Sequence, residues 1–280
     1  MIKNFLRIII YSLYDFIRIF INLKPTQNFI IINPRIFTVI FKFVIIVDKI
    51  KKNIFIQKTR NYSDILTVYE VFSSEHYNLK LFKNFKELDG EYEKILKDKN
   101  FPLIIDCGSN IGTSSVYFNK IFPRSYIYSI EPDKASYEFS KTNINFNNSK
   151  LFNYAINSED TDVKFFSDKN DNRASKVDKT GKEIVKSIKI NQIISETKNK
   201  NIRPFLIKID IEGFESSLFS KNYEWINEFK VIIIEIHDWM APNNSLSFNF
   251  LNALVDTMNY KNKRDLFILG ENLISIKINE

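Results

Sequence analysis

LIIDCGSNIG, residues 103–112, is the stretch of sequence that decides the fold. A short apolar run bounded by Pro102 and Gly108, followed by helical periodicity from Thr113, is typical of a buried parallel strand that leads into a helix. Glycines let the backbone of such a turn approach a ligand closely. The carboxylate of Asp106 at the strand end, with free N–H groups at the helix start, therefore predicts a site for a nucleotide-like cofactor.

From residue 101 onwards the chain alternates between apolar runs and helical patterns. The runs predict strands at 103–107, 126–130, about 151–156, 162–166, 205–209 and 231–236, and a closing hairpin at 264–269 and 273–278. Helices are expected to about residue 122, to about residue 145 and over about 245–258, with a loop over 167–186. The pattern predicts an α/β fold with a doubly wound, Rossmann-like sheet, mostly parallel with one antiparallel C-terminal strand.

The first part of the chain lies outside this pattern, so we expect an apolar and basic helical extension over residues 1–57 and one domain over residues 58–280, with a helical lead-in at 58–100. Polar side chains recur at helical spacing over residues 1–24 and on one face of residues 36–50. Neither segment is charge-free over the roughly 18 residues that a membrane span requires. Two readings stay open: the helices lie on a membrane surface, or they pack on the core or on a second subunit.

The composition limits the partners and the compartment. The net charge is +7, but the lysines are scattered rather than massed, which argues against a nucleic-acid-binding surface. The single cysteine, Cys107, excludes an internal disulfide and a cysteine zinc site, and is compatible with a reducing compartment. We therefore expect a cytoplasmic protein without a nucleic-acid partner, peripheral to the inner face of the membrane if the N-terminal helices bind it.

The strands of the predicted sheet end in acids. Asp106, Glu131, Asp210 and Glu235 close successive strands, Glu212 follows Asp210, and His237 follows Glu235. Ligands of doubly wound sheets bind beyond the carboxyl ends of the strands, so these side chains are expected at one edge. Glu131 lies about twenty residues beyond the glycine turn, where an acid receives the hydroxyls of a ribose. Because the turn reads G-x-x-x-G and lacks the dinucleotide spacing, an adenosine cofactor without a pyrophosphate is favoured.

Four ordered motifs together resemble a known group of proteins. They are IDCGSNIG at 105–112, IEPD at 130–133, KIDIEGFE at 208–215 and IEIH at 234–237. In these motifs the chain resembles the FkbM family of S-adenosylmethionine-dependent O-methyltransferases, over roughly residues 58–280. The resemblance implies a class I methyltransferase sheet, S-adenosylmethionine as cofactor, and methyl transfer to a hydroxyl of a sugar, glycan or related precursor.

The resemblance also implies which residues bind the cofactor. The methionine part would be surrounded by Asp106, Gly108, Asn110 and Gly112. Glu131 would bind the ribose, and Ala155 with Ile156 would form the adenine edge. Where the family usually has Thr-Leu-Asp before the fourth strand, this chain has Lys189-Ile190-Asn191, so no role for an acid is carried over at that point.

Methyl transfer to an oxygen requires positioning and a base that takes the hydroxyl proton. His237 is the predicted base, because the ordinary pKa of histidine lies near neutrality and Glu235 or Asp210 would orient the ring. Asp210 is the alternative base. A histidine that only satisfies a core hydrogen bond is the structural alternative to the catalytic one.

Other polar residues have supporting roles in this interpretation. Lys208 lies inside a buried strand and would either pair with one of the acids or extend to the surface. Arg173 lies in a loop that could cover the acceptor. Asp210, Glu212 and Glu235 could instead hold a hard divalent ion such as Mg²⁺, although we assign no metal ligand from the sequence.

Two other functions fit the same sheet. An NAD-dependent oxidoreductase is disfavoured by the glycine spacing. A non-catalytic, membrane-associated binding protein with a methyltransferase-like fold would bind cofactor or lipid without turnover. Fold and cofactor do not identify the acceptor, and no stretch of the sequence carries a recognisable acceptor signature.

Overall fold

The computed structural model describes residues 10–11, 13, 28–34, 37–166, 176–177, 181, 183–240, 243, 245–259 and 262–278. The chain forms two compact units, Met1–His76 and Tyr77–Glu280, and the expected division after residue 57 stays a prediction. The helix expected over residues 1–24 lies outside the described residues, apart from Ile10, Tyr11 and Leu13, which are helical. Among the described residues, no helix is both long enough and apolar enough to cross a membrane.

The first unit contains a three-stranded antiparallel sheet in the order β1-β2-β3. Its elements are β1 (Phe29–Ile32), the short π-helix η1 (Phe37–Phe41), β2 (Phe43–Asp48), β3 (Asn53–Lys58) and α2 (Tyr62–Phe72). The helix expected over residues 36–50 is therefore wrong. The β-branched run at 44–47 favours a strand, and it pairs on both sides, with β1 and with β3. Alternate burial, with Val44 and Ile46 fully buried, places one face of β2 in a core.

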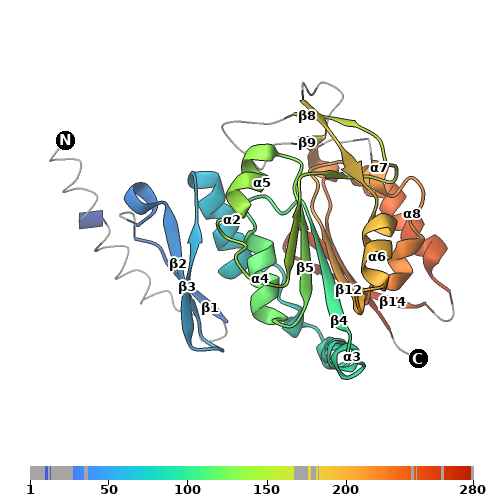
Figure 1. Ribbon diagram of the computed structural model, residues 1–280, viewed down its shortest axis with the longest axis horizontal. Helices are drawn as coiled ribbons and strands as arrows, with labels where there is room; N and C mark the ends of the chain where they lie inside the picture. The colour runs from blue at the N-terminus through green and yellow to red at the C-terminus, as the bar shows by residue number, and fades with distance from the viewer. Residues whose placement is uncertain are drawn as a thin grey trace. The chain divides into compact units, whose positions relative to one another are not determined.

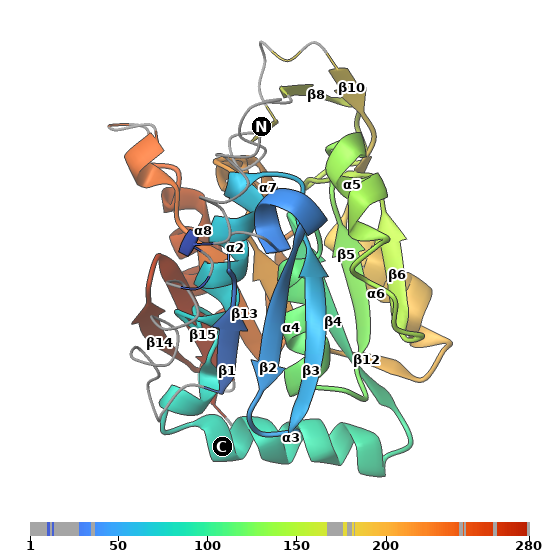
Figure 2. The ribbon, with the colours of Figure 1, turned by 90° about the vertical axis from the view of Figure 1, so that its left-hand side faces the viewer.

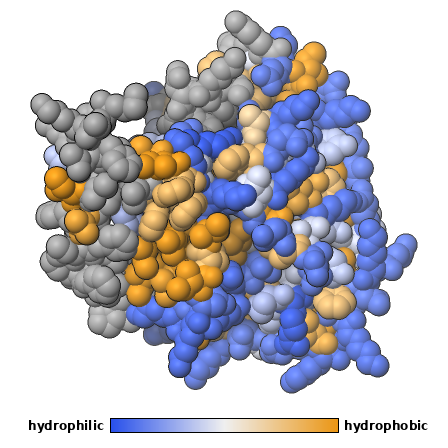
Figure 3. All heavy atoms as spheres, turned by 60° about the vertical axis from the view of Figure 1, so that its left-hand side comes forward, coloured by the Kyte–Doolittle hydropathy of each residue, from blue (hydrophilic) through white to orange (hydrophobic). Residues whose placement is uncertain are grey.

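The opposite face of this small sheet is apolar too. Ile54 and Ile56 of β3 are 69% and 51% exposed, and they pair with Val47 and Ile45 of β2. Figure 3 shows hydrophobic side chains gathered in one area of the molecular surface. Association of residues 1–50 with a membrane surface stays a prediction.

The second unit is built on a seven-stranded sheet in the order β14-β15-β13-β12-β4-β5-β6 (Figures 1 and 2). The strands are β4 (Phe101–Cys107), β5 (Tyr126–Ile130), β6 (Ser149–Phe152), β12 (Ile202–Ile209), β13 (Val231–Glu235), β14 (Arg264–Leu269) and β15 (Asn272–Lys277). Pairing along β6-β5-β4-β12-β13 is parallel, and β15 runs antiparallel to both of its neighbours. This confirms the predicted doubly wound sheet with one reversed strand near the C-terminus.

Helices cover both faces of this sheet. The helices of the unit are α3 (Phe85–Lys97), α4 (Thr113–Ile121), α5 (Lys134–Ser140), α6 (Ile190–Lys198), α7 (Glu215–Leu218) and α8 (Phe248–Thr257), with short 3-10 helices η2 (Leu79–Leu81), η4 (Glu224–Glu228) and η5 (Asp238–Met240). In Figure 1, α4 and α5 lie on one side of the sheet and α6 and α8 on the other. Helix α6 was not predicted, although its buried residues recur at helical spacing: Ile190, Ile193, Ile194 and Thr197.

Two expectations in the middle of the unit need correction. The single strand expected at 151–156 is two strands, since β7 (Ala155–Ile156) leaves the main sheet and pairs with β11 (Ser187–Ile188). The expected loop over 167–186 contains β9 (Lys176–Val177) and β10 (Glu183–Val185), which pair with β8 (Val163–Phe166). Gly181 allows this packing, because a Cβ there would lie 2.4 Å from the backbone carbon of Phe165.

Candidate active site

The carboxyl ends of the parallel strands meet at one edge of the main sheet, as the fold requires. Lys208 pairs in register with Asp106 of the adjacent strand, and Ile209 pairs with Cys107 and with Ile234. Asp210 and Glu235 come directly after these positions. The structure thus brings together six residues from three strand ends: Asp106, Lys208, Asp210, Glu212, Glu235 and His237.

The glycine turn after β4 packs tightly against the end of β12. Gly108 has φ +75°, and a Cβ at this position would lie 1.7 Å from the backbone oxygen of Asp210. Gly112, with φ +84°, is the N-cap residue of α4, and a Cβ there would lie 2.7 Å from the side chain of Ile144. Asn110 also adopts the left-handed conformation. Only residues without a side chain fit the two glycine positions, so the shape of this loop is set by contact with its neighbours.

Two polar side chains of the turn are buried. Asp106 is fully buried and accepts hydrogen bonds from the hydroxyls of Ser114 and Ser115, at 2.6 and 2.5 Å. These bonds attach the first turn of α4 to the strand end. Ser109 is 3% exposed, and its Oγ has no hydrogen-bond partner among the residues that the structure describes. An unpaired hydroxyl in a cofactor-type turn is positioned to bind a polar group of a ligand.

Glu131 organises the turn from the neighbouring strand. Its Oε2 accepts the backbone N–H of Asn110 at 2.7 Å, and its Oε1 accepts that of Asp133 at 2.8 Å. Burial raises the pKa of Glu131 to about 7, although these two N–H groups act against the shift. Each oxygen keeps a second lone pair, so the carboxylate can still accept hydroxyl donors such as those of a ribose.

Lys208 connects the two central strand ends. Its Nζ lies 3.1 Å from Oδ2 of Asp210 and 3.5 Å from Oδ1 of Asp106, and it donates a hydrogen bond of 2.9 Å to the carbonyl of Gly108. Burial alone would lower the pKa of Lys208, but the nearby charges, above all that of Asp210, raise it well above its ordinary value. The lysine is therefore a buried cation that pairs with the acids, and it does not extend to the surface.

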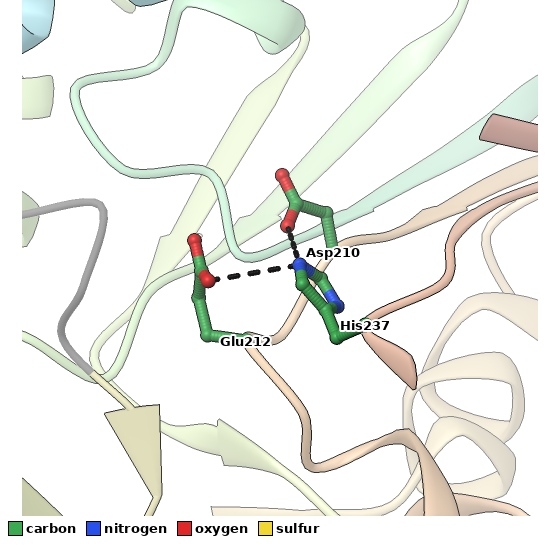
Figure 4. A group of neighbouring side chains, drawn as sticks. All are labelled: Asp210, Glu212 and His237. Carbon is green, nitrogen blue, oxygen red and sulfur yellow. Dashed lines mark ion pairs between the residues drawn. The ribbon is translucent and has the colours of Figure 1, made fainter. Parts of the chain in front are cut away.

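His237 lies beside Asp210 and Glu212, the acids that follow β12 (Figure 4). The ring is 1% exposed, and its Nδ1 is 2.9 Å from Oε1 of Glu215. The other nitrogen, Nε2, faces three carboxylate oxygens, at 3.4 Å from Glu235, 3.6 Å from Glu212 and 3.7 Å from Asp210. Both ring nitrogens of the predicted base therefore face carboxylates.

This environment changes the protonation of the site. Burial lowers the pKa of His237, but the hydrogen bond to Glu215 and the nearby carboxylates outweigh burial and raise the pKa to about 11. Burial and the charge of Asp210 raise the pKa of Glu212 to about 8 and also raise that of Glu235. With the carboxylates as its neighbours, His237 holds a proton at neutral pH and is a poor proton acceptor.

Two other predicted residues, Ala155 and Ile156, lie in β7. Ala155 and Ile156 are 1% and 2% exposed in β7, so their assignment to the adenine edge stays a prediction. Arg173 lies outside the described residues.

Sequence reasoning missed Glu215, the partner of His237. Glu215 closes the KIDIEGFE motif and is the first residue of α7. Its side chain is 3% exposed, and its Oε1 also accepts the backbone N–H of Ile211 at 3.3 Å. Its place in the KIDIEGFE motif was a signal that could have identified it, because the other two acids of that motif, Asp210 and Glu212, were both assigned to the site.

A model of the FkbM methyltransferase domain matches residues 106–262, which is more than half of the chain. The chain belongs to the FkbM methyltransferase family. It is thus a methyltransferase, and its cofactor is S-adenosylmethionine. No protein with a curated description matches it.

Several solved structures are similar at low sequence identity. An O-methyltransferase from Bacillus cereus in complex with SAH is 11% identical, with 79% of this chain and 92% of that chain covered and a TM-score of 0.37. The 16S rRNA methylase ArmA is 11% identical, with coverage of 79% and 99% and a TM-score of 0.32. A precorrin-6y C5,15-methyltransferase from Geobacter metallireducens is 10% identical, with coverage of 65% and 81% and a TM-score of 0.33.

The glycine turn of this FkbM methyltransferase fits its cofactor. The left-handed turn leaves no room for side chains at its glycines, Ser109 presents an unpaired buried hydroxyl, and Glu131 holds the N–H of Asn110 in place. We expect Gly108, Asn110 and Gly112 to hold the methionine part and Glu131 to hold the ribose.

Gly108→Ala should weaken S-adenosylhomocysteine binding at least about tenfold, because the methyl group would meet the backbone oxygen of Asp210 in a strained left-handed conformation. Isothermal titration calorimetry would measure the affinity for S-adenosylhomocysteine. Gly90→Ala is the matched control: a Cβ there meets nothing within 4 Å, and alanine favours helix α3. Equal affinities for the two variants would show that the turn does not hold the cofactor.

Glu131 should make stability depend on pH. Its folded-state pKa of about 7 lies above the ordinary 4.5, so the protonated carboxyl contributes stability that is fully present below about pH 4.5 and is lost as the pH rises through about 7. The melting temperature of the wild type relative to Glu131→Gln should therefore fall from about pH 5 to about pH 8. Scanning calorimetry measures this difference in melting temperature, and Glu224→Gln, which changes an exposed acid, is the control. A pH-independent difference would contradict the assignment.

Proposed function

We propose that this FkbM methyltransferase transfers the methyl group of S-adenosylmethionine to a hydroxyl of a sugar, glycan or related precursor. The observation that carries the proposal is the position of the acids: the backbone oxygen of Asp210 is in contact with the cofactor turn, and its side chain is 22% exposed. An acceptor hydroxyl near that turn would meet carboxylates able to take its proton.

The cofactor supplies a methyl group on a positively charged sulfonium, and the chain supplies orientation and a proton acceptor. Oδ2 of Asp210 is held by Lys208 at 3.1 Å, and His237 already holds a proton. Glu235 is 20% exposed, and burial raises its pKa towards the working range of a general base. We therefore assign proton acceptance to Glu235, which lies 3.4 Å from Nε2 of His237.

An exposed aromatic ring lies next to these acids. Trp239 follows His237 by two residues, its ring centroid is 6.4 Å from that of the histidine, and it is 68% exposed. An exposed indole offers a flat apolar surface with a polar edge, which suits the face of a sugar ring. Trp239 and the scattered lysines together favour a sugar acceptor over a nucleic acid.

Turnover with hydroxyl acceptors tests the proposed function. The purified protein, incubated with S-adenosylmethionine and a panel of glycosides and nucleotide sugars, should produce S-adenosylhomocysteine and an acceptor heavier by one CH₂ on oxygen. Glu235→Gln should lower kcat at least about 100-fold, because the proton acceptor is lost, and leave S-adenosylhomocysteine affinity unchanged. Glu224→Gln is the control. Methylation of RNA or of a carbon atom, with no sugar methylated, would overturn the proposal.

Trp239→Ala should raise KM for the sugar acceptor roughly threefold to tenfold with little change in kcat, because the lost contact binds ground state and transition state alike. Phe101→Ala is a suitable control, since Phe101 is a partly exposed aromatic residue at the start of β4, the opposite end of that strand. An unchanged KM for Trp239→Ala would remove the indole from the acceptor site.

A further inference from the structure

We propose that Asp210, Glu212 and His237 bind a divalent transition-metal ion. One donor atom from each residue lies within 4.8 Å of the other two. Nε2 of His237 is 3.7 Å from Oδ1 of Asp210 and 3.6 Å from Oε2 of Glu212 (Figure 4). Donors that share one ion at about 2.1 Å are separated by about 3 to 3.5 Å, so only small side-chain movements are needed.

The orientation of His237 is the independent observation that indicates an ion. Nδ1 is fixed by Glu215 at 2.9 Å, which leaves Nε2 directed at the acids. The ion would replace the proton that Nε2 carries in the metal-free protein, and the neutral imidazole would be the ligand. Metal-binding histidines are oriented in this way, with a carboxylate on the nitrogen that does not bind the metal. The contacts of Nε2 are 3.4 to 3.7 Å long, beyond the usual range of N–H···O hydrogen bonds. A buried ring nitrogen is thus aimed at carboxylates without a good hydrogen bond to any of them.

The charges of the site also favour a cation. Five acids lie within ion-pairing distance of two bases: Asp106, Asp210, Glu212, Glu215 and Glu235 surround Lys208 and His237. Lys208 pairs with Asp106 and Asp210, on the side of the glycine turn. An excess of carboxylates in a largely buried site is costly, and a divalent ion would compensate it.

The donor set indicates the class of metal. One imidazole and two carboxylates suit Mn²⁺, Fe²⁺ or Zn²⁺, whereas Mg²⁺ and Ca²⁺ prefer oxygen ligands alone. Asp210 and Glu212 are 22% and 26% exposed, so the open side of such a site could accept an oxygen from outside. The site therefore combines the ligands of a transition metal with an open position.

The role of this ion rests on the proposed function. An acceptor hydroxyl bound to it would have a lowered pKa. Its O–H bond would break with the proton passing to Glu235, and the oxygen would form a bond to the methyl carbon. The carbon–sulfur bond would break with its electron pair going to sulfur, which leaves neutral S-adenosylhomocysteine.

Binding of Mn²⁺ to the metal-free, full-length protein tests the site without turnover. Electron paramagnetic resonance, which reports free Mn²⁺, should show loss of the free-ion signal up to one ion per chain. Glu212→Gln should weaken binding at least about tenfold, because a ligand is lost. Glu224→Gln, which removes the same charge at an exposed position of η4, should bind Mn²⁺ like the wild type. Zn²⁺ should displace bound Mn²⁺ in the wild type.

Two outcomes would overturn the metal site: no binding by the wild type, or equal binding by Glu212→Gln and Glu224→Gln. Binding of S-adenosylhomocysteine, measured by calorimetry, would check that Glu212→Gln is folded, which is expected because Glu212 is partly exposed. Methylation of a sugar by protein that binds no Mn²⁺ or Zn²⁺ would refute the metal site and keep the proposed function. Mn²⁺ binding without methylation of any hydroxyl would support the site and refute that function.

Discussion

The buried ion pairs of Lys208 hold the centre of this site together. One ammonium group contacts the acid at the end of β4, the acid after β12 and the carbonyl of Gly108. A lysine in this position is costly to bury, and its cost is offset by the carboxylates of Asp210 and Asp106, at 3.1 and 3.5 Å from its Nζ. The cofactor turn and the acids are therefore placed by the same interaction, and neither can shift without breaking it.

That arrangement explains why the acids are so close together. Parallel strands bring the ends of β4, β12 and β13 to one edge, and the left-handed residues Gly108 and Glu212 turn the chain there at once. Like charges in a partly buried site repel one another, so they need a cation. In the described residues, Lys208 and His237 provide two, and the carboxylates still outnumber them.

Much of this could be read from the sequence, for physical reasons. Strands β5, β12 and β13 were predictable because buried parallel strands are continuous apolar runs, and the acids after them were predictable as a group because such strands end at one edge. Strand β2 was mistaken for a helix, since Val-Ile-Ile-Val alone does not distinguish the two. Helix α6 was missed because polar residues lie among its four buried positions, so that the segment contains no long apolar run.

The sequence by itself determined the kind of protein. It predicted a doubly wound sheet, a glycine turn that lacks the spacing of dinucleotide-binding proteins, and acids at the edge where a cofactor and an acceptor would meet. Only the tertiary structure decided what those acids do to one another. The protonation of His237, the pairing of Lys208 and the part played by Glu215 depend on distances between residues that are up to about a hundred positions apart. Such electrostatic effects depend on the distance between the groups and on their burial, and the order of the residues along the chain gives neither quantity.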